Sequence, residues 1–188
     1  MSELTSAPPP QPGPDDHVRG SGAITILYLD LACPHCAAAW SSIRELPLRL
    51  CMRHFPVSSK HPRSPILHAA AEAAACQRED AFGEMWDSLL ADRGHRDDPH
   101  LWERAERMGL DLERFERDRR SAGVAERVGR DFRSGIRAGV ASTPAAFVRG
   151  ELIQGAGLLE GLRATIPATE KSKNRGPWTE RPRGKESR

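Results

Sequence analysis

The chain carries the stretch ITILYLDLACPHC at positions 24–36, where a largely apolar run passes into two cysteines separated by two residues. The apolar run is typical of a buried strand. Pro34 suits the first position of a helix, where a missing backbone N–H costs nothing, so Cys33 is expected at the helix N-terminus. The unpaired N–H groups and the positive end of the helix dipole stabilise a thiolate there. The stretch therefore predicts a reactive dithiol at the junction of a strand and a helix.

Composition indicates one domain with polar ends. The chain has 188 residues, which is enough for a single domain with a sizeable core. Positions 170–188 hold seven Lys or Arg and three Glu, a charge of +4 in a chain whose net charge is +2, so the rest carries −2. A near-neutral body with a short basic tail does not favour a nucleic-acid partner. No apolar stretch approaches the roughly 18 residues of a membrane span.

The first twenty positions do not resemble a secretory signal. Pro8-Pro9-Pro10 and Asp15-Asp16 stand where a signal has its apolar core, and no basic start precedes them. We therefore expect a cytoplasmic protein. In that compartment four cysteines indicate catalysis or metal binding rather than a framework of structural disulfides.

Hydrophobic periodicity predicts the order strand, helix, strand, helical block, hairpin and helix. The first half of this order consists of a strand over 23–29, a helix over 34–46 and a strand over 48–55. The helical block, about 65–138, is opened by Ser64 as a cap, and Asp98 and Asp111 are predicted to cap later helices.

The period then changes from helical to alternating. Residues 145–149 and 151–154 flank Gly150 and predict a hairpin, and a last helix is expected over 158–166. We therefore expect one domain over 22–166. A Pro-rich arm over 1–21 and a basic tail over 167–188 are both expected to be disordered.

Several sequence features together resemble the DsbA-like branch of the thioredoxin superfamily. Besides the helical block, they are Asp30-Leu31-Ala32-Cys33-Pro34-His35-Cys36, Arg53-His54-Phe55-Pro56, Gly109-Leu110-Asp111 and Gly139-Val140-Ala141-Ser142-Thr143-Pro144. A C-x-x-C at a strand–helix junction, with Thr-Pro just before a late hairpin, is a specific signal. The resemblance covers about residues 23–166. It implies an α/β thioredoxin fold with a helical subdomain inserted between the second strand and the C-terminal β-hairpin. The family also includes cytosolic members and domains attached to bacterial sodium/proton antiporters, which this sequence also resembles.

The resemblance gives each residue of the dithiol motif a role. Cys33 is the expected nucleophile, which forms a mixed disulfide with a partner, and Cys36 is the expected resolving thiol one helical turn deeper. The Pro34-His35 dipeptide resembles that of relatively oxidising members, in which the histidine stabilises the reduced thiolate. The alternative is that His35 is an exposed side chain in a turn. Since the dithiol is itself the redox centre, we expect no bound organic cofactor.

Two further positions are candidates for tuning and substrate binding. Thr143-Pro144 resembles the cis-proline loop that faces the dithiol in this superfamily, where the Thr143 backbone can pair with an extended substrate. A trans proline that opens a strand is the other interpretation. Asp30 is expected to relay a proton to Cys36 if burial raises its pKa, or else to accept a local backbone hydrogen bond.

Other notable residues receive structural interpretations. Cys51 and Cys76 lie in apolar stretches, which favours buried, unreactive thiols, and a disulfide between them stays open. Three tryptophans have core spacing: Trp40, Trp86 and Trp102. Three histidines lack metal-ligand spacing: His54, His61 and His68.

The predicted function is thiol–disulfide exchange with protein or small-molecule thiols, with an unidentified electron donor or acceptor. The sequence does not decide whether this exchange oxidises, reduces or isomerises the disulfides of its partner. One alternative is a glutathione-dependent isomerase or transferase of the same fold, although those relatives usually carry serine at the thiol position. The other is a non-catalytic binding module whose dithiol acts as a redox or zinc switch. Zinc prefers four ligands, and a second C-x-x-C is absent from the sequence.

Overall fold

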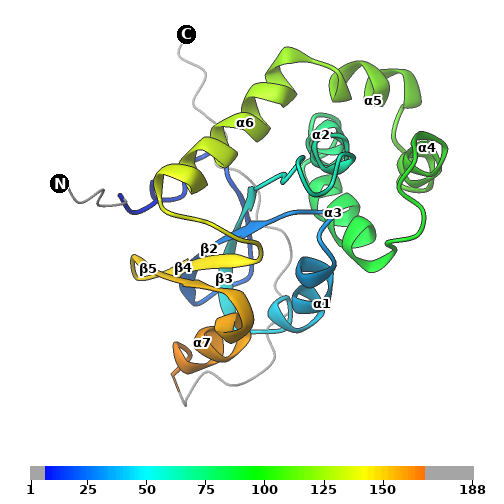
Figure 1. Ribbon diagram of the computed structural model, residues 1–188. Helices are drawn as coiled ribbons and strands as arrows, with labels where there is room; N and C mark the ends of the chain where they lie inside the picture. Colours follow the sequence, from blue (N-terminus) through cyan, green and yellow to red (C-terminus); the bar gives the residue numbers. More distant parts are fainter. Residues whose placement is uncertain (1–6, 168–188) are drawn as a thin grey trace, which may run out of the picture.

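Helices surround a mixed sheet in the computed structural model, which describes residues 7–167 (Figure 1). The helices are α1 Pro34–Ile43, α2 Ser64–Ala75, α3 Ala81–Ala91, α4 Asp98–Arg107, α5 Leu112–Arg119, α6 Ala122–Arg137 and α7 Leu158–Ala164, with a 3-10 turn at Gly155–Gly157 before α7. The predicted order of elements is confirmed, with one additional strand at the N-terminal end. None of the helices between residues 7 and 167 has the length and apolarity that a bilayer crossing requires.

Strand β2 (Ala23–Leu29) is the centre of the sheet. It pairs in parallel with β3 (Leu48–His54) and antiparallel with β4 (Ala145–Val148). Strands β1 (His17–Arg19) and β5 (Glu151–Gln154) form the edges, so the order is β1-β3-β2-β4-β5. The α/β thioredoxin-like fold with a helical insertion is therefore confirmed, and the dithiol follows the central strand directly.

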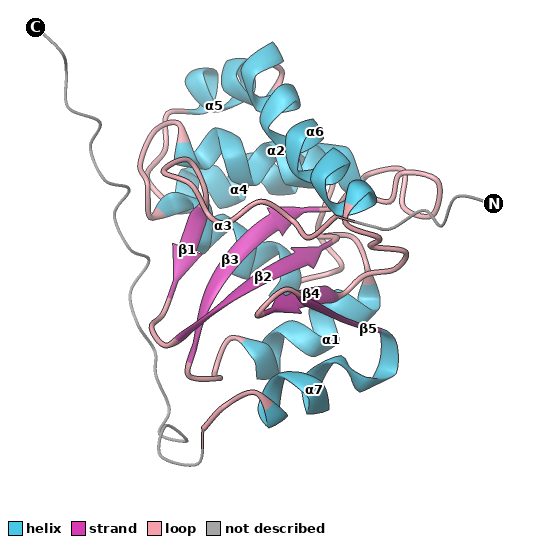
Figure 2. Cartoon of the chain, turned by 90° about the vertical axis from the view of Figure 1, so that its left-hand side faces the viewer, coloured by secondary structure: helices cyan, strands magenta, loops and turns pink. Residues whose placement is uncertain are grey.

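The two faces of β2 pack into two different clusters. Because successive side chains of a strand point to opposite faces, Leu27 and Leu29 contact one cluster, which includes Trp40 of α1. Ile26 and Tyr28 contact the other cluster. Figure 2 shows α1 and α7 on one side of the sheet and α6 on the other. The sheet thus lies between two layers of helices, which hold in place the end of β2 from which the dithiol segment continues.

Helix α6 approaches the sheet closely at Gly135. A Cβ atom at this position would lie 2.7 Å from a ring carbon of Phe55 and 3.0 Å from the ring of Tyr28. One residue earlier, the Ser134 hydroxyl hydrogen-bonds the Tyr28 hydroxyl at 2.7 Å. The absence of a side chain at Gly135 therefore allows α6 to pack directly on the aromatic side chains of the sheet.

The prediction of a disordered arm over 1–21 is wrong for residues 17–19. These residues form β1, which pairs antiparallel with β3. Polar contacts fix this part of the arm, since His17 Nε2 lies 2.9 Å from Glu72 Oε1 and Arg53 Nη2 lies 3.1 Å from Asp16 Oδ2. Residues 1–6, and all of the predicted tail 167–188 except Pro167, lie outside the described residues.

Three local predictions also need correction. Ser64 lies within the first turn of α2, and its hydroxyl donates to Asp30 instead of capping the helix. Asp97, not Asp98, caps α4 by accepting from the backbone N–H of His100, whereas the predicted cap at Asp111 is confirmed. Trp102 is 39% exposed and donates to Glu116, so it is not a core residue.

Candidate active site

Cys33 lies at the N-terminus of α1, where the chain turns from strand to helix. It is the N-cap residue, with extended backbone angles (φ −74°, ψ 126°), and Pro34 follows within the first turn. Its backbone N–H donates to the Asp30 carbonyl at 3.0 Å, which closes the turn after β2. Cys33 is 5% exposed, whereas Cys36, one turn deeper in the helix, is fully buried.

The two thiols have opposite acidities. The pKa of Cys33 is lowered to about 5, first by a hydrogen bond from the Cys36 thiol and further by backbone N–H groups of α1, while partial burial acts in the opposite direction. Burial raises the pKa of Cys36, and so do the hydrogen bond and the charge of Cys33. The Asp30 backbone N–H also donates to Cys36 Sγ at 3.3 Å. The arrangement therefore favours a thiolate at Cys33 and a protonated thiol at Cys36.

The segment before β4 lies against the dithiol. The Thr143–Pro144 peptide bond is cis. The Cys33 thiol donates to the Thr143 carbonyl across 3.7 Å. Pro144 is buried and leads directly into β4 beside the central strand. The fold thus brings together two motifs that are more than one hundred residues apart in the chain.

A cavity of about 330 Å³ opens in front of Cys33. Three segments line it: Cys33-Pro34-His35, Val57 with Lys60 and His61, and Ala141-Ser142-Thr143. The segments beside the dithiol motif are loops at the two ends of the helical insertion, and no helix of the insertion lines this cavity. His35 is exposed, as its alternative interpretation states, but it lies in the first turn of helix α1 and not in a turn between elements.

Asp30 is fully buried and accepts several hydrogen bonds. Its donors are the backbone N–H of Ala32 at 2.8 Å, that of Val57 at 3.1 Å and the Ser64 hydroxyl at 2.5 Å. Burial acts to raise the pKa of Asp30, but the polar neighbours of its carboxylate, which include the Ser64 hydroxyl and the Ala32 N–H, outweigh it, so this pKa is lowered. The proton-relay prediction, which required a raised pKa, is therefore wrong. The local backbone hydrogen bond expected as its alternative is present.

A buried polar chain behind Asp30 was not predicted from the sequence. The Leu31 N–H donates to His68 Nε2 at 3.2 Å, and Nδ1 of His68 lies 2.7 Å from Nδ1 of His54. His54 Nε2 then lies 2.6 Å from Glu72 Oε1, which also contacts His17. These partners assign one neutral tautomer to each ring, with His68 donating to His54 and His54 donating to Glu72.

The pKa shifts of His54, His68 and Glu72 are consistent with these neutral histidine tautomers. Burial lowers the pKa of both His54 and His68, that of His54 to about 4, so both rings are neutral near pH 7. Although burial alone would raise it, contacts with His17 and His54 hold the pKa of Glu72 well below its usual value. The sequence signal for this chain was the i, i+4 spacing of His68 and Glu72, which places both on one face of α2.

The other two cysteines differ from each other. Cys51 is buried in β3, and burial raises its pKa to about 12. Cys76 follows α2 and is exposed, so its prediction as a buried thiol is wrong. No disulfide joins Cys51 to Cys76. Among residues 7–167, no group of three or more His, Cys, Asp or Glu side chains is placed to hold a metal ion.

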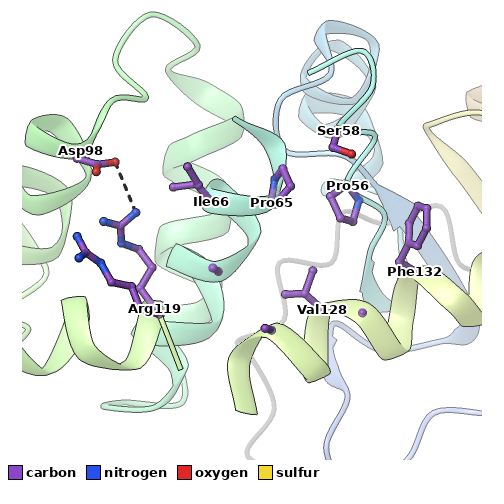
Figure 3. A pocket seen from close by; sticks show the side chains of 12 residues that line it. Pro56, Ser58, Pro65, Ile66, Asp98, Arg119, Val128 and Phe132 are labelled. Carbon is purple, nitrogen blue, oxygen red and sulfur yellow. Dashed lines mark hydrogen bonds and ion pairs between the residues drawn. The ribbon is translucent and has the colours of Figure 1, made fainter. Parts of the chain in front are cut away.

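A larger cavity of about 600 Å³ lies between α2 and α6. Figure 3 shows its apolar wall, which includes Ile66, Val128 and Phe132, and at one end the charged pair of Asp98 and Arg119. Pro56 and Ser58 line this cavity, whereas Val57 between them lines the cavity of the dithiol. Neighbouring residues of one segment thus line two separate cavities, and of these two only the smaller contains a thiol.

The fold and the dithiol define a thioredoxin-like protein, and similarity to known proteins gives its family. Residues 52–166 match the DSBA-like thioredoxin domain family. The chain belongs to this family, whose members are disulfide oxidoreductases. The matched segment includes the Thr143–Pro144 loop and begins after Cys33 and Cys36.

The chain is also similar to individual proteins and solved structures. The chain is 38% identical over 162 residues to the Na⁺/H⁺ antiporter NhaA 3 of Salinispora tropica; the match covers 80% of the chain and 24% of the antiporter. The chain thus spans about a quarter of the length of that relative. Among solved structures, α-DsbA2 of Wolbachia pipientis has a TM-score of 0.70 at 20% identity, covering 78% of this chain and 83% of that one. A thioredoxin-like oxidoreductase from Silicibacter pomeroyi has a TM-score of 0.70 at 23% identity, covering 81% and 90%. These two likenesses show the fold.

Proposed function

We propose that the chain exchanges disulfides with thiol-containing partners through Cys33 and Cys36. The observation that carries this proposal is the position of Cys33 at the N-terminus of α1 beside Thr143, with Cys36 buried one turn deeper; there the pKa of Cys33 is lowered to about 5 and that of Cys36 is raised. A nucleophile that is already ionised at neutral pH can attack a disulfide without a separate base. A second thiol that keeps its proton does not compete for the same disulfide.

The exchange balances as two successive displacements. The Cys33 thiolate attacks one sulfur of the partner disulfide, and the other sulfur leaves as a thiolate that takes up a proton from water. Cys36 then loses its proton and attacks Cys33 Sγ, which releases the partner as a second thiol and closes the Cys33–Cys36 disulfide. The dithiol loses two electrons and the partner gains them. The reverse sequence oxidises a partner, and no bound organic cofactor takes part because the sulfurs carry the electrons.

The Thr143 backbone is proposed to hold an extended partner beside Cys33. Its carbonyl lies 3.7 Å from Cys33 Sγ, and the residue that follows, Pro144, has no N–H to donate. A peptide in extended form can pair with the backbone of such a segment as an added strand.

A trapping experiment tests this proposal. In Cys36→Ser the second displacement cannot occur, so mixed disulfides should accumulate at Cys33 when the reduced protein meets a disulfide substrate. The matched control is Cys51→Ser, which removes a buried thiol outside the site and should neither trap nor slow exchange. Exchange of 2-hydroxyethyl disulfide that persists in Cys33→Ser, or that is absent from the wild-type chain, would contradict the proposal.

A further inference from the structure

We propose that the cavity in front of Cys33 selects thiols and disulfides that carry carboxylates, with Lys60 and His61 as the specificity-determining residues. This inference rests on the proposed exchange function and names the substrate class of the same site. The nine residues that line the cavity include His35, Lys60 and His61 but no aspartate or glutamate. The polar surface that a substrate meets around Cys33 therefore favours negative charge.

The positive charge of Lys60 is not neutralised by a neighbour. Lys60 is exposed, and it is the one lysine between residues 7 and 167. Within that described range, the side chains of Lys60, His61 and His35 make no hydrogen bond or ion pair. Arg119 in the larger apolar cavity differs, because Asp98 and Glu116 pair with it. An unpaired cation at the mouth of a site attracts an anionic substrate, whereas a paired one attracts it little.

The segment that carries Lys60 and His61 is fixed relative to the dithiol. The backbone N–H groups of Lys60 and His61 both donate to the Val57 carbonyl, at 3.0 and 2.9 Å. The Val57 N–H in turn donates to Asp30 Oδ2 at 3.1 Å, and Asp30 lies in the turn before Cys33. The buried carboxylate thus ties the backbone of this turn to the turn before Cys33, which keeps Lys60 and His61 beside the dithiol.

A further cation lies behind the dithiol. The guanidinium of Arg96 donates to the Ala32 carbonyl at 3.2 Å and to the Leu89 carbonyl at 3.1 Å. Both acceptors are neutral, so these contacts do not cancel its charge, and Arg96 is near enough to Asp30 for the two to interact electrostatically. Arg96 therefore offsets part of the negative charge of the buried Asp30 carboxylate behind the cavity.

The size of the cavity narrows the class of substrate. A volume of about 330 Å³ is at the small end of ligand sites in proteins, which span about 300 to 1,000 Å³. It suits a low-mass peptide thiol with free carboxylates. A cysteine flanked by acidic residues in a larger protein presents the same carboxylates. A peptide probe distinguishes such a protein segment from the low-mass thiol.

Three symmetrical disulfides that differ in charge test this inference. The reduced chain is mixed at low ionic strength with glutathione disulfide, which is anionic, with neutral 2-hydroxyethyl disulfide, or with cationic cystamine, and the second-order rate constants are compared. We expect the anionic disulfide to react fastest and cystamine slowest, with the difference shrinking as salt is added. In Lys60→Gln the ratio of the anionic to the neutral rate should fall about fivefold, the effect of one unit charge near contact distance in water. Lys60→Glu should reverse the order of anionic and cationic disulfides.

The controls separate this inference from the function on which it rests. His61→Gln should lower the anionic-to-neutral ratio by a smaller factor than Lys60→Gln. Arg117→Gln removes the same charge from an exposed position of α5 outside the cavity and should leave the ratio unchanged.

An equal ratio in the wild type, Lys60→Gln and Lys60→Glu would overturn the charge selection while leaving exchange intact. Failure of the wild type to react with the neutral disulfide would overturn both. Faster reaction of the reduced chain with the symmetrical disulfide of an Asp-Cys-Asp peptide than with glutathione disulfide would assign the site to acidic proteins instead of the low-mass thiol.

Discussion

Replacement of Cys36 by alanine should make Cys33 a markedly weaker acid. The hydrogen bond from the Cys36 thiol is the largest of the contributions that set the pKa of Cys33 at about 5. With that pKa the ratio of thiolate to thiol at pH 7 is about 100, whereas a free cysteine with a pKa near 8.5 is only about 3% ionised. At pH 7 this difference stabilises the reduced folded state by about 2 kcal/mol after allowance for solvent screening at the mouth of the cavity. That free energy raises the reduction potential of the pair by about 40 mV.

The pH dependence of alkylation measures this effect directly. The iodoacetamide rate of the reduced wild-type chain should follow a single titration with a midpoint at about 5. Cys36→Ala should move the midpoint upward by more than about one unit, because the donor is lost. Cys36→Ser keeps a hydroxyl donor at the same place and should move it less. Since the pKa of Cys33 is lowered by folding, the associated stabilisation is complete above about 8.5 and is lost as the pH falls through about 5.

Two results would refute this reasoning. The first is a wild-type midpoint near that of a free cysteine, which would mean that the N-terminus of α1 and the Cys36 thiol do not stabilise the Cys33 thiolate. The second is an unchanged midpoint in Cys36→Ala. In that case the backbone N–H groups of α1 alone would account for the lowered pKa, and the proposed asymmetry of the two thiols would need another cause.

Three further predictions concern the scaffold around the dithiol. Gly135→Ala should lower the free energy of unfolding in urea by about 1–3 kcal/mol, because the new Cβ would lie 2.7 Å from Phe55. Asp30→Asn should cost roughly 3 kcal/mol in the same assay because an NH₂ group replaces one of the two acceptor oxygens and faces a buried donor, whereas Ser64→Ala should cost about 1 kcal/mol. The unfolded chain binds a proton at His54 near pH 6.5 and the folded chain only near 4, so stability should fall by roughly 3 kcal/mol as the pH decreases between these values.

Each scaffold prediction has an outcome that would contradict it. A Gly135→Ala variant as stable as the wild type would show that α6 can shift away from Phe55 without cost. Equal losses in Asp30→Asn and Ser64→Ala would mean that the backbone donors to Asp30 contribute little. A wild-type stability that is flat between pH 7 and about 4 would show that His54 is not buried in its neutral form.

The candidate site was only partly predictable. The Cys33–Cys36 motif and the Thr143–Pro144 loop were found because each has a recognisable local sequence, and the structure places them side by side. The direction in which the pKa of Asp30 shifts was not predictable. Burial raises this pKa and hydrogen bonding lowers it, and the sequence does not show which effect is larger. Trp102 was misjudged for a related reason: a periodic position on a helix is buried only where another element covers it.

What the sequence alone determined is the part of the fold that depends on neighbouring residues. An apolar run followed by Cys33 and Pro34 specifies a strand, a turn and a helix through steric and hydrogen-bonding preferences that act over a few positions. Tertiary structure decided the partners across the chain: the His68–His54–Glu72 series, the place of β1 at the edge of the sheet, and the position of Lys60 at the mouth of the cavity. These contacts join segments many residues apart, and the packing that brings them together depends on the burial of the whole core, which no local pattern encodes.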